Sequence, residues 1–399
     1  MKHSQSMQDA DSTAMKNEAD ATNSNSNKPD LIYLDNNGSM QPHDKVMEAM
    51  RPYLSNSFGN PSSGHWAADS AKKCVEDARR SVADLIGATP GEIVFTSGGS
   101  EANNHALKGV WGMAARKGAH FITSAIEHDA VLRPLRYLKT QGAKVTMLPV
   151  GHGGIVDPED VTKALCDDTV LISVMHANNE IGTIQPIEQI AEIARQAGVL
   201  MHTDAAQSVG KIAVNVSELG VDLLSLAGHK FGAPNGIGAL YIRTDLRLCP
   251  LLHGGGHERG NRAGTESALL TAGIGMAAEI VAGKSSSRVR LLRDYFWDCL
   301  VRSFGNKVVL NGHPEKRVPN TLSISFPGQV GADILGQMPH VAATTGSACH
   351  AGCVDMSHVL IAMGASLDIG IGTIRFSLSD RNTVDEIDVV VRDLKLAMS

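Results

Sequence analysis

After residue 30, short apolar runs alternate with amphipathic stretches along the chain. Seven runs of five to seven residues predict strands at Glu92–Thr96, His120–Ser124, Lys144–Val150, Val170–His176, Val199–Thr203, Leu223–Ala227 and Gly238–Arg243. Helical patterns such as Glu101–Arg116 and Pro186–Gln196 lie between them. Near-continuous apolar strands separated by helices are typical of a mostly parallel sheet covered on both faces. We therefore predict an α/β fold whose large domain holds a mostly parallel seven-stranded sheet flanked by helices.

The pattern changes after Gly260, where two helical patterns precede three short apolar runs and a last helix. These elements are expected at Glu266–Ala282, Arg288–Phe304, Pro319–Phe326, Ala342–Ala348, Ile374–Ser379 and Val384–Ala397. Such an arrangement predicts a smaller α+β domain. The expected division is a tail at 1–30, an N-terminal segment at 31–44 that packs with the small domain, a large domain at 45–265 and a small domain at 266–399.

The first 30 residues contain no Val, Ile, Leu, Phe, Trp, Tyr or Cys. Such a segment cannot bury enough apolar surface to offset the entropy lost on ordering, so we predict a disordered tail. Two interpretations stay open for it: a solvated tail, and a docking or regulatory segment. The tail lacks the apolar core of a secretory signal, and Arg51 is the first arginine of the chain, which disfavours a mitochondrial presequence.

The charge balance is mildly acidic, since 36 Lys and Arg stand against 42 Asp and Glu for a net charge of −6. This excludes a nucleic-acid-binding protein that works through bulk positive charge. No apolar run approaches the roughly 18 residues of a membrane span. Six cysteines among 399 residues are too sparse for a disulfide scaffold. We therefore expect a cytoplasmic protein with reduced thiols, no structural zinc site, and neither nucleic acid nor membrane as a partner.

Polar clusters follow several of the predicted strands, where open α/β sheets bind their ligands. The clusters are Glu127-His128-Asp129, Asn178-Asn179-Glu180, His202-Thr203-Asp204-Ala205-Ala206-Gln207 and Gly228-His229-Lys230. In addition, a turn with Gly98, Gly99 and Ser100 leads from a strand into a helix, where backbone amides can hold a phosphate. A lysine that loses its proton readily forms a Schiff base with a carbonyl. Together, a lysine, an aspartate, a histidine and a phosphate-ready turn suggest pyridoxal 5'-phosphate as cofactor.

The same residues carry a family resemblance. From about Tyr33 to Leu394, the chain resembles the cysteine desulfurase and selenocysteine lyase group of class V aminotransferases, which are fold-type I pyridoxal-phosphate enzymes. The motifs that carry the resemblance are Leu34-Asp35-Asn36-Asn37, Gly59-Asn60-Pro61-Ser62-Ser63, Thr96 to Asn104, Ala177-Asn178-Asn179-Glu180, His202 to Ser208, Gly228-His229-Lys230, His253 to Gly256, Gly264-Thr265-Glu266, Gly346-Ser347-Ala348-Cys349 and Ile374-Arg375-Phe376-Ser377. Their order and intervals make the set specific.

The resemblance implies a role for each matched residue. Lys230 would be the Schiff-base lysine, Asp204 the partner of the pyridine nitrogen, and His128 a ring-stacking proton shuttle. Further cofactor contacts are implied for Gln207, Asn179, Ser100, Gly99, His229 and, from a second subunit, Thr265.

Substrate contacts are implied for Arg375, which clamps the carboxylate, and for Asn179 and Asn36. Cys349 would be the nucleophile that takes sulfur from L-cysteine as a persulfide and leaves L-alanine. The resemblance thus implies a homodimeric sulfur-transfer enzyme with a protein acceptor. Selenocysteine lyase is the alternative activity.

Some features depart from the family's pattern or leave alternatives open. The run Asn37-Gly38-Ser39-Met40-Gln41-Pro42 stands where relatives have Asn-Ala-Thr-Thr-x-Pro, and Ala227 where a phosphate-binding serine is common. Cys353 would resolve the persulfide or be a bystander, and His253 with His257 would bind a metal or shape a loop. Two rival classes are a pyridoxal-phosphate aminotransferase, which needs no Cys349, and a catalytically silent scaffold.

Overall fold

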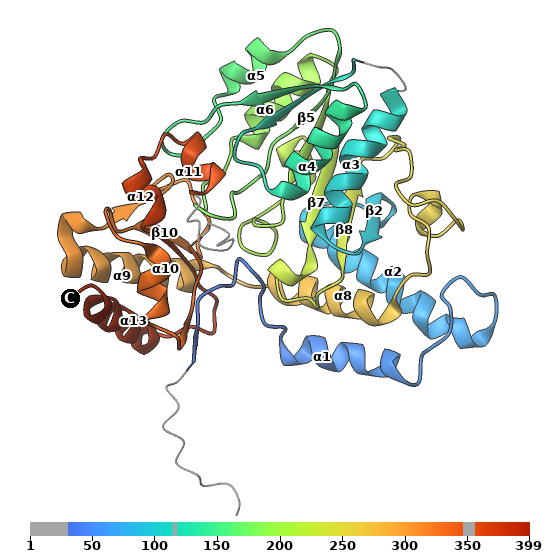
Figure 1. The fold of residues 1–399 in the computed structure, drawn as a ribbon. Helices are drawn as coiled ribbons and strands as arrows, with labels where there is room; N and C mark the ends of the chain where they lie inside the picture. Colours follow the sequence, from blue (N-terminus) through green and yellow to red (C-terminus); the bar gives the residue numbers. More distant parts are fainter. Residues whose placement is uncertain (1–30, 115–117, 346–355) are drawn as a thin grey trace, which may run out of the picture.

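The large unit is built on a seven-stranded sheet (Figure 1). The structure is a computed structural model, and it describes residues 31–114, 118–345 and 356–399. The strands, in their spatial order, are β2 (Ile93–Thr96), β8 (Gly238–Ile242), β7 (Leu223–Ala227), β6 (Leu200–Asp204), β5 (Thr169–Ser173), β3 (His120–Ser124) and β4 (Lys144–Leu148). β8 runs antiparallel to β2 and β7, and the other neighbours are parallel. The predicted mostly parallel sheet is confirmed.

Helices cover both faces of this sheet because successive strand residues point to opposite sides. In β7, Leu223 packs into the core beneath α3 (Gly99–Ala114) and α4 (Asp129–Thr140). Its neighbour Leu224 packs into the opposite core, which the following helices cover. They are α2 (Trp66–Ile86), α6 (Ile187–Gln196), α7 (Val216–Leu219) and α8 (Ala268–Ala282).

The small unit holds a three-stranded antiparallel sheet and its own core. The sheet order is β12 (Thr373–Ser377), β10 (Thr321–Ser325) and β9 (Val309–Leu310). Helices α9 (Ser287–Phe304) and α13 (Val384–Ala397) pack against it through apolar side chains such as Phe296, Phe326 and Phe376. This is an α+β arrangement, as the sequence pattern predicts.

The remaining elements are short. They are α1 (Asp44–Met50), η1 (Arg51–Leu54), η2 (Pro90–Glu92), α5 (Pro158–Ala164), η3 (Gly228–Lys230), η4 (Glu258–Gly260), η5 (Gly305–Lys307), α10 (Gly331–Gly336), α11 (His358–Ala362) and α12 (Leu367–Ile371).

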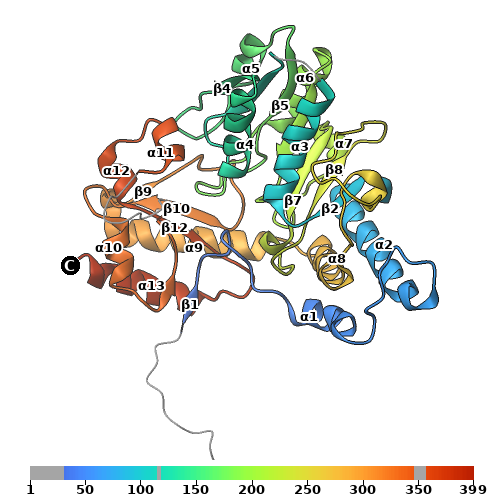
Figure 2. The same ribbon diagram turned by 45° about the vertical axis from the view of Figure 1, so that its right-hand side comes forward.

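The N-terminal segment joins the two units (Figure 2). β1 (Ile32–Tyr33) pairs in parallel with β11 (Val341–Ala342), and Asp35 bridges to Ser377 of β12. The chain then crosses to the large unit, where α1 packs on α8. Although the sequence analysis counts α8 with the small domain, Ile274, Ala277 and Ala278 of this helix belong to the core of the large sheet.

A buried ion pair fixes the loop that precedes α8. Arg79 of α2 donates to Glu258 at 2.7 and 3.0 Å, and both side chains are almost fully buried. Glu258 also accepts a hydrogen bond from the backbone nitrogen of Phe95 in β2, at 3.0 Å. The pair therefore ties α2, β2 and the loop together.

Among the described residues, no single helix combines the length and apolarity needed to cross a bilayer, and only α8 and α9 taken together across a 76° bend reach that threshold.

Candidate active site

A cavity of about 600 Å³ opens where the strands of the large sheet end. Side chains that follow β2, β3, β6 and β7 line it, namely Ser100, His128, Gln207 and Lys230, together with Arg375 from β12 of the small sheet. The cavity therefore lies between the two units. Ligands of open α/β sheets bind at the carboxyl ends of the strands.

Lys230 ends the short η3 turn directly after β7. Its amine donates to the backbone oxygens of Asn37 at 2.6 Å and Gly38 at 2.8 Å. Burial and the nearby Arg375 guanidinium lower the pKa of Lys230 from 10.5 to about 8, while the carboxylates of Asp35 and Asp204 oppose the shift. A substantial share of this amine is therefore neutral near pH 7.5, which is the form that attacks a carbonyl.

Asp204 ends β6 and is 5% exposed. One of its carboxylate oxygens accepts from Asn103 Nδ2 at 2.7 Å and the other from the backbone nitrogen of Ala206 at 3.0 Å. Each oxygen keeps further capacity to accept a hydrogen bond. The carboxylate is therefore held in one orientation and can still receive a protonated ring nitrogen.

His128 follows β3 as the N-cap of α4, and its Nδ1 accepts from the backbone nitrogen of Ala130 at 3.0 Å. In the neutral ring, Nε2 must then carry the hydrogen, because Nδ1 is the acceptor. The ring lines the cavity. It can present a flat face or the Nε2 hydrogen to a ligand.

The glycine turn between β2 and α3 forms the end of the cavity. Gly98 has a φ of +147°, which only glycine adopts without strain, and α3 begins at the next residue. A methyl group on Gly238 of β8 would lie 2.7 Å from the Gly98 Cα, so the strand and the turn touch backbone to backbone. The first backbone N–H groups of α3, which is 16 residues long, have no hydrogen-bond partner within the helix. They point out of its N-terminal end and favour the binding of an anion there.

Arg375 is buried on β12, and its two terminal nitrogens are both engaged. One donates to the Asn179 backbone oxygen at 2.9 Å and the other to Asp35 Oδ1 at 2.6 Å. Its Nε has no partner among the described residues. The planar fork of arginine suits a carboxylate, so Arg375 is placed to hold an acidic ligand at the small-unit side of the cavity.

Comparison with known proteins supports a single family. The model of the family described as aminotransferase class V matches residues 32–390. The chain belongs to the class V aminotransferase family. A relative from Dictyoglomus turgidum named cysteine desulfurase IscS is 45% identical over 362 residues, which cover 90% of this chain and 92% of the relative.

Solved structures of similar proteins agree with this class V fold. One named NifS-like protein has a TM-score of 0.86 and 35% identity, covering 92% of this chain and 99% of that chain. Another, named SspA in complex with cysteine, has a TM-score of 0.79 and 36% identity, covering 87% of this chain and 98% of that chain.

Most of the residues that the sequence analysis selects in this class V chain line one cavity. They are Gly99, Ser100, His128, Asn179, Asp204, Gln207, His229, Lys230 and Arg375. Asn36 does not line it, because its side-chain amide donates to the Ser377 backbone oxygen at 2.8 Å and faces a second cavity. Thr265 is exposed and lies outside the cavity of its own chain. Cys349 and Cys353 lie outside the described residues.

The structure also brings in residues that sequence reasoning missed. Asn37 and Asn103 line the cavity, and Lys211 contacts the side chains of Asn37 and Gln207 from behind. Asn37 and Asn103 stand inside motifs used for the family resemblance, so their presence is a signal that the sequence offers. For Lys211, four residues after Gln207, the only signal is a lysine in an otherwise apolar stretch.

The residues of the cavity fit pyridoxal phosphate. They supply an amine of lowered pKa on Lys230, a carboxylate on Asp204 and a helix start for a phosphate. Ala227 stands at the turn in place of a hydroxyl side chain, so the backbone amides and Ser100 would hold most of the phosphate. Burial and Lys230 lower the pKa of His229 to about 4, so this ring is neutral and donates through an N–H.

A second buried titratable group lies beside the cavity. Glu127 accepts from Ser124 Oγ at 2.5 Å and from the backbone nitrogen of Met175 at 2.9 Å, and its other oxygen has no partner among the described residues. Burial raises the pKa of Glu127 to about 8. The carboxyl group is therefore protonated through most of the neutral range.

Proposed function

We propose that this chain is a pyridoxal-phosphate-dependent cysteine desulfurase, which converts L-cysteine to L-alanine and transfers the sulfur to its own Cys349. One observation carries the proposal: Lys230 and Asp204 line the same cavity as the glycine turn at the start of α3. The name of the Dictyoglomus turgidum relative and the identity over 90% of the chain support the choice of reaction.

When bound, the cofactor supplies an aldehyde for a covalent bond with an amine and a ring that takes up the electron pair released at the substrate Cα. Lys230 would hold the aldehyde and, once displaced by the amine of cysteine, remove the Cα proton with its Nζ. Asp204 would keep the proton on the ring nitrogen, since its carboxylate is fixed by Asn103 and by a backbone amide. His128 would cover one face of the ring.

Arg375 would bind the carboxylate of cysteine and thereby orient its Cα. This guanidinium is held by Asp35 and the Asn179 backbone oxygen, while its Nε is left without a partner. A substrate carboxylate would share the guanidinium with Asp35. The amino acid would then lie between the small sheet and Lys230.

The sulfur step uses Cys349 as a thiolate. A bond forms between the Cys349 sulfur and the substrate sulfur while the substrate Cβ–S bond breaks, so the products are a Cys349 persulfide and alanine. The backbones of Thr344 and Arg375 hydrogen bond to each other, at 2.7 Å for the shorter contact. Because Cys349 follows Thr344 by five residues, even a fully extended chain keeps it within about 18 Å of that point.

The test uses purified protein supplied with pyridoxal phosphate. We expect a yellow absorption that is lost in Lys230→Ala, and alanine plus sulfide from cysteine that are lost in Cys349→Ala. Cys166→Ala removes an exposed thiol outside the cavity and is the matched control, expected to keep full activity. Alanine release that survives Cys349→Ala would refute the persulfide route, and a protein that stays colourless would refute the cofactor assignment.

The same assay with L-selenocysteine decides between the two activities of the group. A desulfurase is expected to turn over L-cysteine in the wild type and to lose that turnover in Cys349→Ala. Selenocysteine turnover in Cys349→Ala does not separate the two activities, because a selenolate leaves more easily than a thiolate in either enzyme. A wild-type protein that turns over selenocysteine and not cysteine would replace the proposal by the alternative.

We further propose that the enzyme is a cytoplasmic homodimer that hands its sulfur to an acceptor protein. Three large apolar side chains between η1 and α2 are exposed in the single chain, namely Leu54, Phe58 and Trp66. Thr265, which is exposed and does not line the cavity of its own chain, would reach the phosphate site of the second subunit. Light scattering is expected to give twice the chain mass of 42.2 kDa. A fully active monomer would contradict the dimer.

A further inference from the structure

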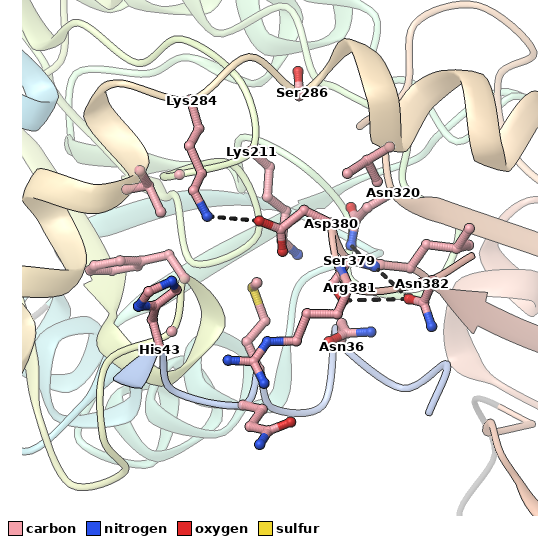
Figure 3. A pocket seen from close by; sticks show the side chains of 18 of the residues that line it. Asn36, His43, Lys211, Lys284, Ser286, Asn320, Ser379, Asp380, Arg381 and Asn382 are labelled. Carbon is pink, nitrogen blue, oxygen red and sulfur yellow. Dashed lines mark hydrogen bonds and ion pairs between the residues drawn. The ribbon is translucent and has the colours of Figure 1, made fainter. Parts of the chain in front are cut away.

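A second cavity, of about 280 Å³, is drawn in Figure 3. Its walls come from the N-terminal segment, α8, α9 and the loop after β12. Two lysines line it. Lys284 pairs with Asp380 at 2.7 Å, whereas Lys211 contacts two residues of the catalytic cavity, Asn37 and Gln207.

The Lys211 side chain is 7% exposed, and its amine contacts side chains that line the catalytic cavity. Its Nζ donates to Gln207 Oε1 at 2.5 Å and to Asn37 Oδ1 at 2.8 Å. Within the part of the chain that the structure describes, no carboxylate is among its hydrogen-bond partners. A buried lysine held only by two amide oxygens is unusual, because burying an unpaired charge is costly.

Burial, together with the positive charges of Lys230 and Arg375, holds the pKa of Lys211 well below its ordinary range. The shift favours the neutral amine, whose two hydrogens match the two amide oxygens in number. In that form the group needs no counter-ion.

Both amides are consequently fixed in one orientation. If the Gln207 amide turned over, its NH₂ group would face the Lys211 N–H, and two donors would meet in a buried site. In the observed orientation, Gln207 Nε2 donates to the Asn37 backbone oxygen at 3.1 Å. That same oxygen accepts from Lys230 Nζ at 2.6 Å. The Gln207 N–H group therefore lies beside the amine that would bind the cofactor aldehyde.

We propose that Lys211 is a positioning residue: by donating to the amide oxygens of Gln207 and Asn37, it keeps the Gln207 N–H directed at the catalytic cavity, where this group would donate to the ring oxygen of a bound cofactor. The inference rests on the proposed cofactor and adds a residue that does not touch it. Lys211 acts through Gln207, so removing either side chain should remove the same interaction.

A double-mutant cycle tests this on the full-length protein. Lys211→Met keeps the length of the side chain and removes its donors, and Gln207→Met does the same for the amide. For each variant, the dissociation constant of pyridoxal phosphate and the pH midpoint of its visible absorbance are measured. Because each single variant would weaken a hydrogen bond to a charged acceptor, we expect it to bind the cofactor roughly tenfold or more weakly. The double variant should be no weaker than Gln207→Met alone.

Lys284→Met is the matched control. Lys284 also lines the second cavity, but it pairs with Asp380 and does not contact Gln207. It is expected to leave both readouts unchanged. Should Lys211→Met fail to fold, Lys211→Gln, whose amide keeps two donors, takes its place and is expected to give a smaller loss. Additive losses in the double variant, or a Lys211 variant with wild-type affinity and midpoint, would overturn the inference. A wild-type protein that gives no Lys230-dependent colour would instead overturn the cofactor assignment.

Discussion

The lowered pKa of Lys230 gives the most direct test of the site's electrostatics. Its value of about 8, against the usual 10.5, amounts to about 3 kcal/mol in favour of the neutral amine. At pH 7.5, about one quarter of the amine is then neutral, compared with roughly one molecule in a thousand for an unperturbed lysine. The rate at which cofactor-free protein takes up pyridoxal phosphate should therefore rise with pH and level off just above pH 8.

Two variants move this midpoint in opposite directions. The positive charge of Arg375 lowers the pKa of Lys230, so Arg375→Met should raise the midpoint. Asp35 opposes the shift, so Asp35→Asn should lower it. Stopped-flow absorbance of cofactor loading, followed from pH 6 to pH 10.5, measures all three midpoints.

The reasoning fails if the wild-type midpoint lies at pH 10 or above, since burial would then not govern the amine. It also fails if Arg375→Met and Asp35→Asn move the midpoint in the same direction. Far-UV circular dichroism of the cofactor-free variants checks that each one is folded over this pH range.

Three further predictions concern stability and cofactor affinity. Arg79→Ala leaves Glu258 buried without its partner and should cost about 3–5 kcal/mol in urea unfolding; a loss under 1 kcal/mol would contradict the burial of the pair. Gly238→Ala places a methyl group 2.7 Å from the Gly98 Cα and should weaken cofactor binding roughly tenfold, measured by titration, while an unchanged affinity would show that the turn yields freely. Because folding raises the pKa of Glu127 from 4.5 to about 8, the folded chain keeps a proton that the unfolded chain has lost. The contribution of Glu127 to the free energy of unfolding should therefore fall from pH 4.5 to pH 8. In urea titrations, the stability of the wild type relative to Glu127→Gln should fall over this range, and a constant difference would be the contrary result.

The strands of the large sheet could be predicted from the sequence because each one is a nearly continuous run of apolar residues. The predicted strand at 120–124 matches β3 residue for residue, and that at 199–203 differs from β6 by one position. Two-residue strands such as β1 and β11 carry no pattern of their own. They exist because segments more than 300 residues apart meet, and local periodicity contains no trace of such a pairing.

The site residues divide in the same way, into those that the local sequence indicates and those that only long-range packing reveals. Residues that follow a strand, such as Lys230 and Asp204, could be selected because topology brings the strand ends together. Asn36 and Asn37 are adjacent in the sequence, and only the packing of the small unit shows that Asn37 reaches the cavity while Asn36 turns to Ser377. Lys211 was missed because its role depends on two amides in the folded chain, one of them 174 residues away.

The path of the N-terminal segment has a consequence for biosynthesis. The backbone oxygens of Asn37 and Gly38 accept hydrogen bonds from the Lys230 amine, and these two residues are synthesised early. Asn37 is held in place by Thr321 and Ser377, which are synthesised much later. A nascent chain that stops short of β12 would contain Lys230 and the glycine turn while lacking both Arg375 and Ser377, one of the two residues that hold Asn37. Binding of pyridoxal phosphate at full affinity should therefore wait until translation is almost finished, because it depends on the last 27 residues, from Thr373 onward.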